Sequence, residues 1–262
     1  MPATLVGFVV ALIMVLVGAQ THHVNPVFLV TNVTALMIVL GGAAGATMMS
    51  YEFSVTTGVI KAILKAMLGK ERPVDLEKTI TTLVEFARKA RGEGLLALES
   101  EMAGLDDPFM KRGLQLAIDG SDPDAVAQVM KAEIKAMKVR HKLMADWCQS
   151  YGIFAPTFGI IGAVVGLIAT LGELDKPEKL GAGIAGAFVA TFLGVFIANG
   201  VMLPLSARMK RMSAQEVQAR EMVVEGVLAI QGGQNPRVIE ETLMSYLSPK
   251  EAEALRAASS SS

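Results

Sequence analysis

Polar side chains that could do chemistry are scarce inside four long apolar stretches of this sequence. The third and fourth stretches carry Thr157, Thr170, Thr191 and Asn199, and none of the four contains an Asp, Glu, Lys, Arg or His. Hydroxyl and amide groups can line a hydrated path, but they do not titrate near neutral pH and so cannot relay protons. If this chain conducts protons, the titrating carboxylate must come from another chain.

The other reactive residue types form no recognisable site. Cys148 is the only cysteine, so it has no partner for an intramolecular disulfide and no second ligand at zinc-binding spacing. His22, His23 and His141 are expected in loops or on the surface, and no nucleophile or phosphate-loop constellation is present. We expect neither an enzyme nor a bound metal or cofactor.

The composition is that of a membrane protein. Of the 262 residues, 52% are hydrophobic, the mean hydropathy is +0.46 and the formal net charge is only -1. These values exclude a disordered chain and a nucleic-acid-binding chain. The charged residues crowd into the segments between and after the apolar stretches, which is typical of a polytopic membrane protein.

The apolar stretches reach or approach the roughly 20 residues that a bilayer crossing needs. They run over residues 4–18, 27–49, 153–171 and 180–205. The predicted fold class is an all-α polytopic membrane protein with four transmembrane helices and a helical cytoplasmic domain. Its parts are a transmembrane hairpin over residues 1–50, the cytoplasmic domain over 51–150, a second hairpin over 151–207 and a cytoplasmic helical tail over 208–262.

Helices are also predicted outside the spans. They cover residues 75–90, 94–102, 108–118, 123–147, 208–225, 236–246 and 249–257. The third and fourth spans are expected to continue into the helices at 123–147 and 208–225. Residues 56–69 are expected to form an amphipathic helix along the membrane surface, with Lys61 and Lys65 off its apolar face. That face consists of Val59, Ile60, Ile63, Leu64 and Met67.

The distribution of basic residues predicts the orientation. Every Lys and Arg except Lys176 and Lys179 lies in residues 51–147 or after Leu205. The positive-inside rule therefore places those segments and both termini in the cytoplasm, and the loop at 172–179 outside. We expect a multi-pass protein of the bacterial inner membrane.

Small residues form a ridge on each of the last two spans. The ridges are Gly159, Gly162, Ala163 and Gly166 in the third span, and Gly186, Ala190, Gly194 and Ala198 in the fourth. Such ridges let helices approach closely, either within the chain or against a partner helix. Pro156 and Pro204 remove backbone donors near the start of the third span and the end of the fourth, which indicates either a static bend or a hinge.

Three segments resemble one known family. They are R-x-x-G-x-x-x-L-E at residues 91–99, APTFGIIGAVVGLIATL at 155–171 and GAFVATFLGVFIANGVMLPL at 186–205. With the pattern of spans, they resemble the flagellar stator A subunits, which are motility protein A and its sodium-driven relatives, over nearly the whole chain. The resemblance implies a stator subunit that forms an ion channel with a B subunit and converts ion-motive force into torque on the rotor.

The resemblance also implies residue roles. Pro156, Thr191 and Pro204 match family positions at the ion pathway and the cytoplasmic end of the fourth span, and Thr157 adds a hydroxyl beside Pro156. Arg91 and Glu99, with Arg88 nearby, match the charges that such subunits use against the rotor's switch protein, FliG. In that family several A subunits, thought to be five, form a homo-oligomeric ring around the helices of two B subunits. The B subunit's aspartate is the titrating group.

Ala163 bears on the choice of ion. Sodium-driven relatives have a threonine there, and its hydroxyl would help coordinate a dehydrated sodium ion, so the small apolar residue favours protons. A second interpretation is an ExbB/TolQ-like proton-driven motor subunit energising outer-membrane processes, although those subunits typically have three spans and an outside N-terminus. An autonomous transporter would show inverted repeats and discontinuous helices, and neither is visible in the sequence.

Overall fold

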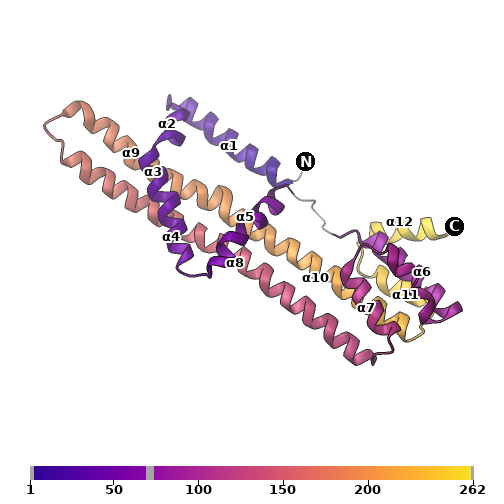
Figure 1. The fold of residues 1–262 in the computed structure, drawn as a ribbon. Coiled ribbons are helices and arrows are strands. Elements are labelled where there is room, and N and C mark those ends of the chain that lie inside the picture. The colour runs from indigo at the N-terminus through magenta and orange to yellow at the C-terminus, as the bar shows by residue number, and fades with distance from the viewer. Residues whose placement is uncertain (1–2, 69–73, 261–262) are drawn as a thin grey trace. The chain divides into compact units, whose positions relative to one another are not determined.

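The computed structural model describes residues 3–68 and 74–260, and every regular element in these ranges is a helix (Figure 1). Four helical stretches are long and apolar enough to cross a membrane: Thr4–Thr21, Pro26–Met48, Pro123–Leu171 and Pro177–Gln231. The four predicted spans and the all-α fold class are confirmed. Contacts divide the chain into two compact units, residues 1–71 with 141–211 and residues 72–140 with 212–262.

The second span is interrupted, whereas the sequence pattern predicts an unbroken helix. It consists of α2 (Pro26–Thr31), α3 (Val33–Leu36), the π-helical η1 (Met37–Gly41) and α4 (Gly42–Met48), and it follows α1 (Ala3–Thr21). The break lies at Asn32, whose backbone is extended and whose Oδ1 accepts a 3.0 Å hydrogen bond from the Ala35 amide. Asn32 therefore caps α3, and this local bond competes with continuation of α2.

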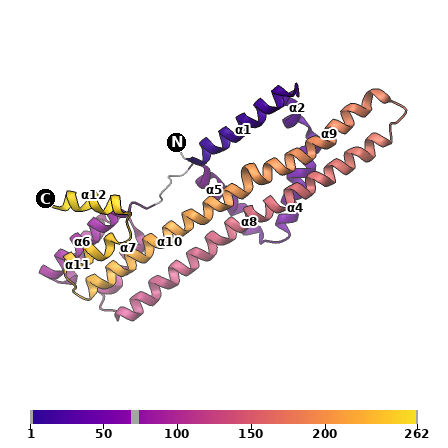
Figure 2. The same cartoon turned by 180° about the vertical axis from the view of Figure 1, so that it is seen from behind.

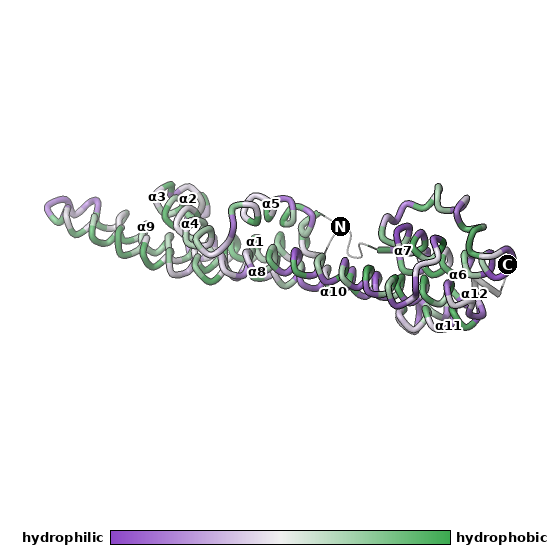
Figure 3. The backbone as a smooth tube through the Cα atoms, turned by 60° about the horizontal axis from the view of Figure 1, so that its bottom comes forward, coloured by the Kyte–Doolittle hydropathy of each residue, from purple (hydrophilic) through white to green (hydrophobic). Residues whose placement is uncertain are grey.

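The third span and the helix predicted at residues 123–147 form one continuous helix, as predicted. The helix α8 runs unbroken from Pro123 to Leu171 and includes Pro156. The fourth span is α9 (Pro177–Phe196), followed by the π-helical η4 (Ile197–Met202) and then by α10 (Leu203–Gln231). Figure 3 colours α9 mostly as hydrophobic.

Pro204 lies in the first turn of α10, directly after the π-helical segment. A proline lacks the amide donor, and its ring clashes with the carbonyl four residues earlier. The π-helical turn at Ile197–Met202 widens the backbone just before Pro204. The bend expected from the proline is therefore replaced by this π-helical turn.

The predicted helix at residues 56–69 forms within α5 (Phe53–Leu68), but the side chains of its predicted apolar face divide between a buried and an exposed side. Val59 is 1% exposed, whereas Ile60 and Leu64 are 61% and 52% exposed. The helix thus presents apolar residues on two sides, because its inner side packs within the first unit. The predicted final residue, Gly69, lies outside the described residues.

The second unit has its own core. Its helices are α6 (Leu76–Glu93), α7 (Pro108–Ile118), α11 (Pro236–Met244) and α12 (Pro249–Ser260), which gather around the C-terminal part of α10 (Figure 2). Apolar side chains of α6, α7, α8, α10 and α11 fill the core, and the fully buried ones include Leu83, Leu114, Val126, Met222 and Leu243. These residues recur at helical spacing and so follow from the amphipathic pattern.

The helix predicted at residues 94–102 is wrong. α6 continues through Gly92 to Glu93, and two short 3-10 turns follow, η2 (Leu95–Leu98) and η3 (Glu101–Gly104). Gly94 ends α6 with a φ of 87°, a left-handed conformation that favours glycine. The glycine that ends the helix is thus Gly94.

Candidate functional site

The helices α8 and α9 touch along the two predicted ridges. A Cβ atom built at Gly159 would lie 2.9 Å from the Ala190 carbonyl oxygen and 3.2 Å from the Thr191 Cα. One built at Gly194 would lie 2.6 Å from the Ala155 carbonyl oxygen and 3.1 Å from the Pro156 Cα. The two backbones approach so closely that only glycine fits. Intrachain packing therefore accounts for these parts of the ridges.

The second span covers one side of this helix pair. Ile38 lies near Gly162, the Phe158 ring lies over Gly42, and Ala35 packs in one cluster with Val189 and Leu193. On α9 the opposite side stays exposed, at a spacing of three and four residues that defines one helix face. Its residues are Ile184, Phe188, Val195 and Asn199, with the half-exposed Thr191 among them.

Thr191 lies at the edge of this exposed face, next to α8. Pro156 and Ala163, both half-buried, border the same edge from α8. They lie roughly 70–90° around α8 from the residues that face α9, on the side opposite Phe158 and the second span. Among the residues that the structure describes, the Thr191 hydroxyl has no hydrogen-bond partner. The structure thus brings Pro156, Ala163 and Thr191 together and leaves one hydroxyl available there.

Thr157 and Pro204 do not join this group. Thr157 is two residues from both Ala155 and Gly159, or about 200° around α8, so it points away from α9. It is exposed, and its Oγ1 donates a 2.6 Å hydrogen bond to the Phe154 carbonyl. Pro204 is exposed and 13 residues beyond Thr191, which is about 20 Å along the helix.

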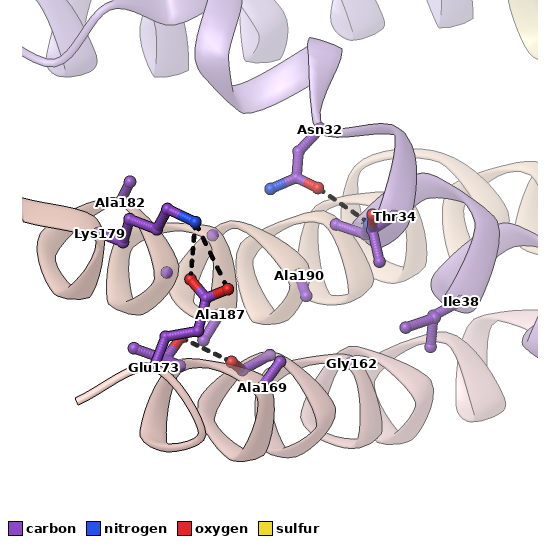
Figure 4. A pocket seen from close by; sticks show the side chains of 15 residues that line it. Asn32, Thr34, Ile38, Gly162, Ala169, Glu173, Lys179, Ala182, Ala187 and Ala190 are labelled. Atoms are coloured by element: carbon purple, nitrogen blue, oxygen red, sulfur yellow. Dashed lines mark hydrogen bonds and ion pairs between the residues drawn. The ribbon is translucent and has the colours of Figure 1, made fainter. Parts of the chain in front are cut away.

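A cavity near the loop between α8 and α9 was missed by the sequence interpretation (Figure 4). It has a volume of about 360 Å³ and is lined by residues of α3, η1, α8 and α9 and of the loop between α8 and α9. Asn32 reaches it from the break, with its Nδ2 3.1 Å from a Cβ built at Gly186, and Lys179 pairs with Glu173 at 3.1 Å. Cavities with such polar groups hold water readily. An asparagine inside an apolar span was the available signal.

A second group of predicted residues lies in the other unit, at the corner between α6 and η2. Arg88, Arg91 and Glu99 are all exposed there. Lys89 on α6 donates a 2.6 Å hydrogen bond to Glu101 on η3, and this carboxylate raises the pKa of the Lys89 ammonium above its usual value. The corner therefore presents both signs of charge to solvent on a short, fixed turn.

Two family models match successive parts of the chain. A model of the MotA/TolQ/ExbB proton channel family matches residues 101–222, and a model of the motility protein A N-terminal region matches residues 5–94. Motility protein A of Bacillus subtilis (strain 168) is 36% identical over 248 residues, which cover 95% of this chain and 91% of the relative. This chain belongs to the motility protein A family.

Further similarities lie within the same family. The chemotaxis protein PomA of Vibrio alginolyticus is 36% identical over 251 residues, which cover 94% of each chain. A solved structure of the MotAB complex from C. jejuni has a TM-score of 0.89 at 31% identity, covering 95% of this chain and 97% of the solved chain. The flagellar MotAB stator complex of Bacillus subtilis has a TM-score of 0.86 at 35% identity, with the same coverage.

Proposed function

We propose that this motility protein A family member is the A subunit of a flagellar stator, which forms an ion pathway with a B subunit and turns ion-motive force into torque. The observation that carries the proposal is the exposed face of α9 with a free hydroxyl at its edge. Thr191 sits where α8 and α9 are in backbone contact, so its position is fixed. The spans themselves have no carboxylate to titrate.

The exposed face of α9 receives the B subunit's single helix, which brings the titrating aspartate. When ionised, that carboxylate accepts a hydrogen bond from the Thr191 hydroxyl, and when protonated it no longer needs this donor. Protonation therefore weakens one contact between the subunits, and release of the proton restores it. The rigid glycine contacts at Gly159 and Gly194 hold Thr191 in place while the partner's charge changes.

The driving ion is a proton. Ala163 borders the same edge as Thr191, and its methyl side chain has no oxygen atom. A dehydrated sodium ion needs several oxygen ligands, whereas a carboxylate alone carries a proton. The small apolar side chain thus fits proton transfer better than sodium coordination.

A ring of A subunits, with five copies as the expected number, explains how Thr157 can take part in the ion pathway. Its side of α8 is turned away from α9 of the same chain and carries the exposed Ile153, Ile160 and Val164. In a ring, that side faces α9 of the next copy, so Thr157 of one subunit approaches Thr191 of its neighbour. Exposed apolar surface of this extent is typical of an interface or a lipid-facing surface.

The charged corner supplies the contact to the rotor. Arg88, Arg91 and Glu99 engage oppositely charged groups of the switch protein FliG, and charge complementarity sets the register of such contacts. This places the corner in the cytoplasm, with both termini on the same side of the inner membrane. Pro204 is too far from Thr191 to touch the ion, and its role is to position α10 after the π-helical turn.

The proposal is tested in motile cells whose only stator consists of this subunit and its cognate B partner. We expect swimming to stop with a protonophore and to persist without sodium. Swimming that stops when sodium is removed would overturn the choice of ion but leave the stator in place. Cells that assemble flagella and express both subunits, yet stay immotile, would contradict the stator function, and recovery of an outer-membrane uptake defect would indicate an ExbB/TolQ-like subunit.

A further inference from the structure

Helix α5 carries apolar side chains on two opposite faces. Val55, Val59 and Ala66 are buried. Four larger side chains, between 52% and 72% exposed, recur along the other side, and we name them the outer stripe: Phe53, Ile60, Leu64 and Leu68. At 100° per residue they fall within a sector about 80° wide. Lys61 and Lys65 are exposed directly beside this stripe.

The inner face of α5 fixes the helix on α8. The Trp147 indole nitrogen donates a 3.2 Å hydrogen bond to the Thr56 hydroxyl. A Cβ atom built at Gly58 would lie 2.9 Å from the Met144 methyl carbon, so these two elements are in tight contact. Residues 144–147 come just before the apolar stretch of α8, which begins at Ile153. The helix α5 is therefore held beside the end of a membrane span.

Two features near residues 144–147 of α8 indicate that this part of the helix lies at the border between hydrocarbon and water. Trp147 stacks on Tyr151 with ring centroids 5.5 Å apart, and such amphipathic aromatic residues gather at the headgroup region. Lys210 and Asp146 form an ion pair at 3.2 Å, which is costly inside hydrocarbon. The contact points of α5 thus lie at the membrane surface.

We propose that the outer stripe of α5 inserts into the leaflet on this side of the membrane and that Lys61 and Lys65 bind anionic phospholipid headgroups. An apolar stripe flanked by lysines is the pattern of a helix that lies in an anionic membrane surface. Only residues 49–52 separate α5 from the end of α4, so the helix cannot leave the bilayer surface. This surface exists whether or not the chain drives a flagellar motor.

The experiment uses the full chain in nanodiscs of equal parts phosphatidylglycerol and phosphatidylethanolamine. A fluorescent probe is attached to the Leu64→Cys variant, while Cys148 is fully buried and stays unlabelled, as labelling of the parent chain verifies. Bromine atoms, which quench the probe on contact, are placed on the acyl chains of one lipid or of the other. We expect quenching by both lipids, with at least about twofold more from brominated phosphatidylglycerol.

Paired lysine variants separate charge recognition from simple insertion. Lys61→Gln with Lys65→Gln is expected to make the two brominated lipids quench equally. The control, Lys111→Gln with Lys131→Gln, removes the same charge from exposed positions on α7 and α8 and should keep the preference. Equal quenching in the chain with all its lysines would overturn the headgroup contact. A probe shielded from water but quenched by neither lipid would overturn the proposal and show that a second copy covers the stripe.

Discussion

Gly194 on α9 lies so close to Ala155 on α8 that a Cβ atom at position 194 would be 2.6 Å from the Ala155 carbonyl oxygen. That oxygen belongs to the backbone and cannot rotate away. A Gly194→Ala substitution therefore forces the helices apart at the level of Thr191. We expect it to lower the stability of the folded chain by about 1–3 kcal/mol, as overpacking does.

Thermal unfolding of the purified protein in detergent measures this effect. Gly181→Ala is the matched control, because a Cβ at position 181 has no neighbour within 4 Å and the same helix benefits slightly from alanine. Equal melting temperatures for the two variants would contradict the close contact.

Thr191 tests the ion pathway. Thr191→Ala removes the hydroxyl, and the loss of one hydrogen bond to a charged group, about 1.5–3 kcal/mol, predicts at least a tenfold drop in proton conduction. Thr191→Ser keeps the donor and should retain most of the swimming speed. The measurement is swimming speed together with proton flux into vesicles that contain both subunits.

Thr81→Ala makes the same chemical change at an exposed position on α6 and serves as the control. If Thr191→Ala conducts as well as Thr81→Ala, the hydroxyl has no part in the pathway.

Thr157 and Thr191 point to different sides of their helix pair, which tests the ring. With cysteines at both positions, a short thiol-reactive cross-linker should join separate copies and give a ladder of oligomers on a denaturing gel. Chains with either substitution alone should stay monomeric. Rapid cross-linking within one chain, seen as a mobility shift without oligomers, would refute the arrangement of Thr157 on the far side of α8.

If the charged corner contacts the rotor, reversing the charge of one of its side chains should abolish that contact. Arg91→Glu and Glu99→Arg should each strongly reduce swimming while membrane levels of the subunit stay normal, because both side chains are exposed and contribute little to folding. Lys111→Glu, an exposed reversal on α7, should swim normally. Normal motility of both corner variants would remove these residues from the torque contact.

The Asn32 cap at the break in the second span should contribute to the stability of the folded chain. Asn32→Ala removes the cap of α3 and should destabilise the chain by about 1 kcal/mol. Asn32→Ser can cap in the same way and should melt close to the parent protein. A variant with alanine that is as stable as the one with serine would show that the cap contributes nothing to the break.

The sequence alone determined much of this protein. Runs of apolar residues without charge mark spans wherever they occur, so the four crossings and the all-α class follow from composition and periodicity. The sequence also predicted that the third span continues the helix before it. Small residues at helical spacing predicted a close helix contact at Gly159 and Gly194. The motifs at residues 91–99, 155–171 and 186–205 indicated the family that the comparisons confirm.

Tertiary structure decided the features that depend on competition between local and distant contacts. Asn32 suits a helix cap, but the sequence pattern equally allows a continuous span, and the structure has the break, with α3 packed against α9. The two faces of α5 differ because α8 buries Val59 and leaves Ile60 exposed, which periodicity cannot distinguish. Thr157 and Thr191 have the same chemistry in sequence, and only the contact between α8 and α9 places them on different sides.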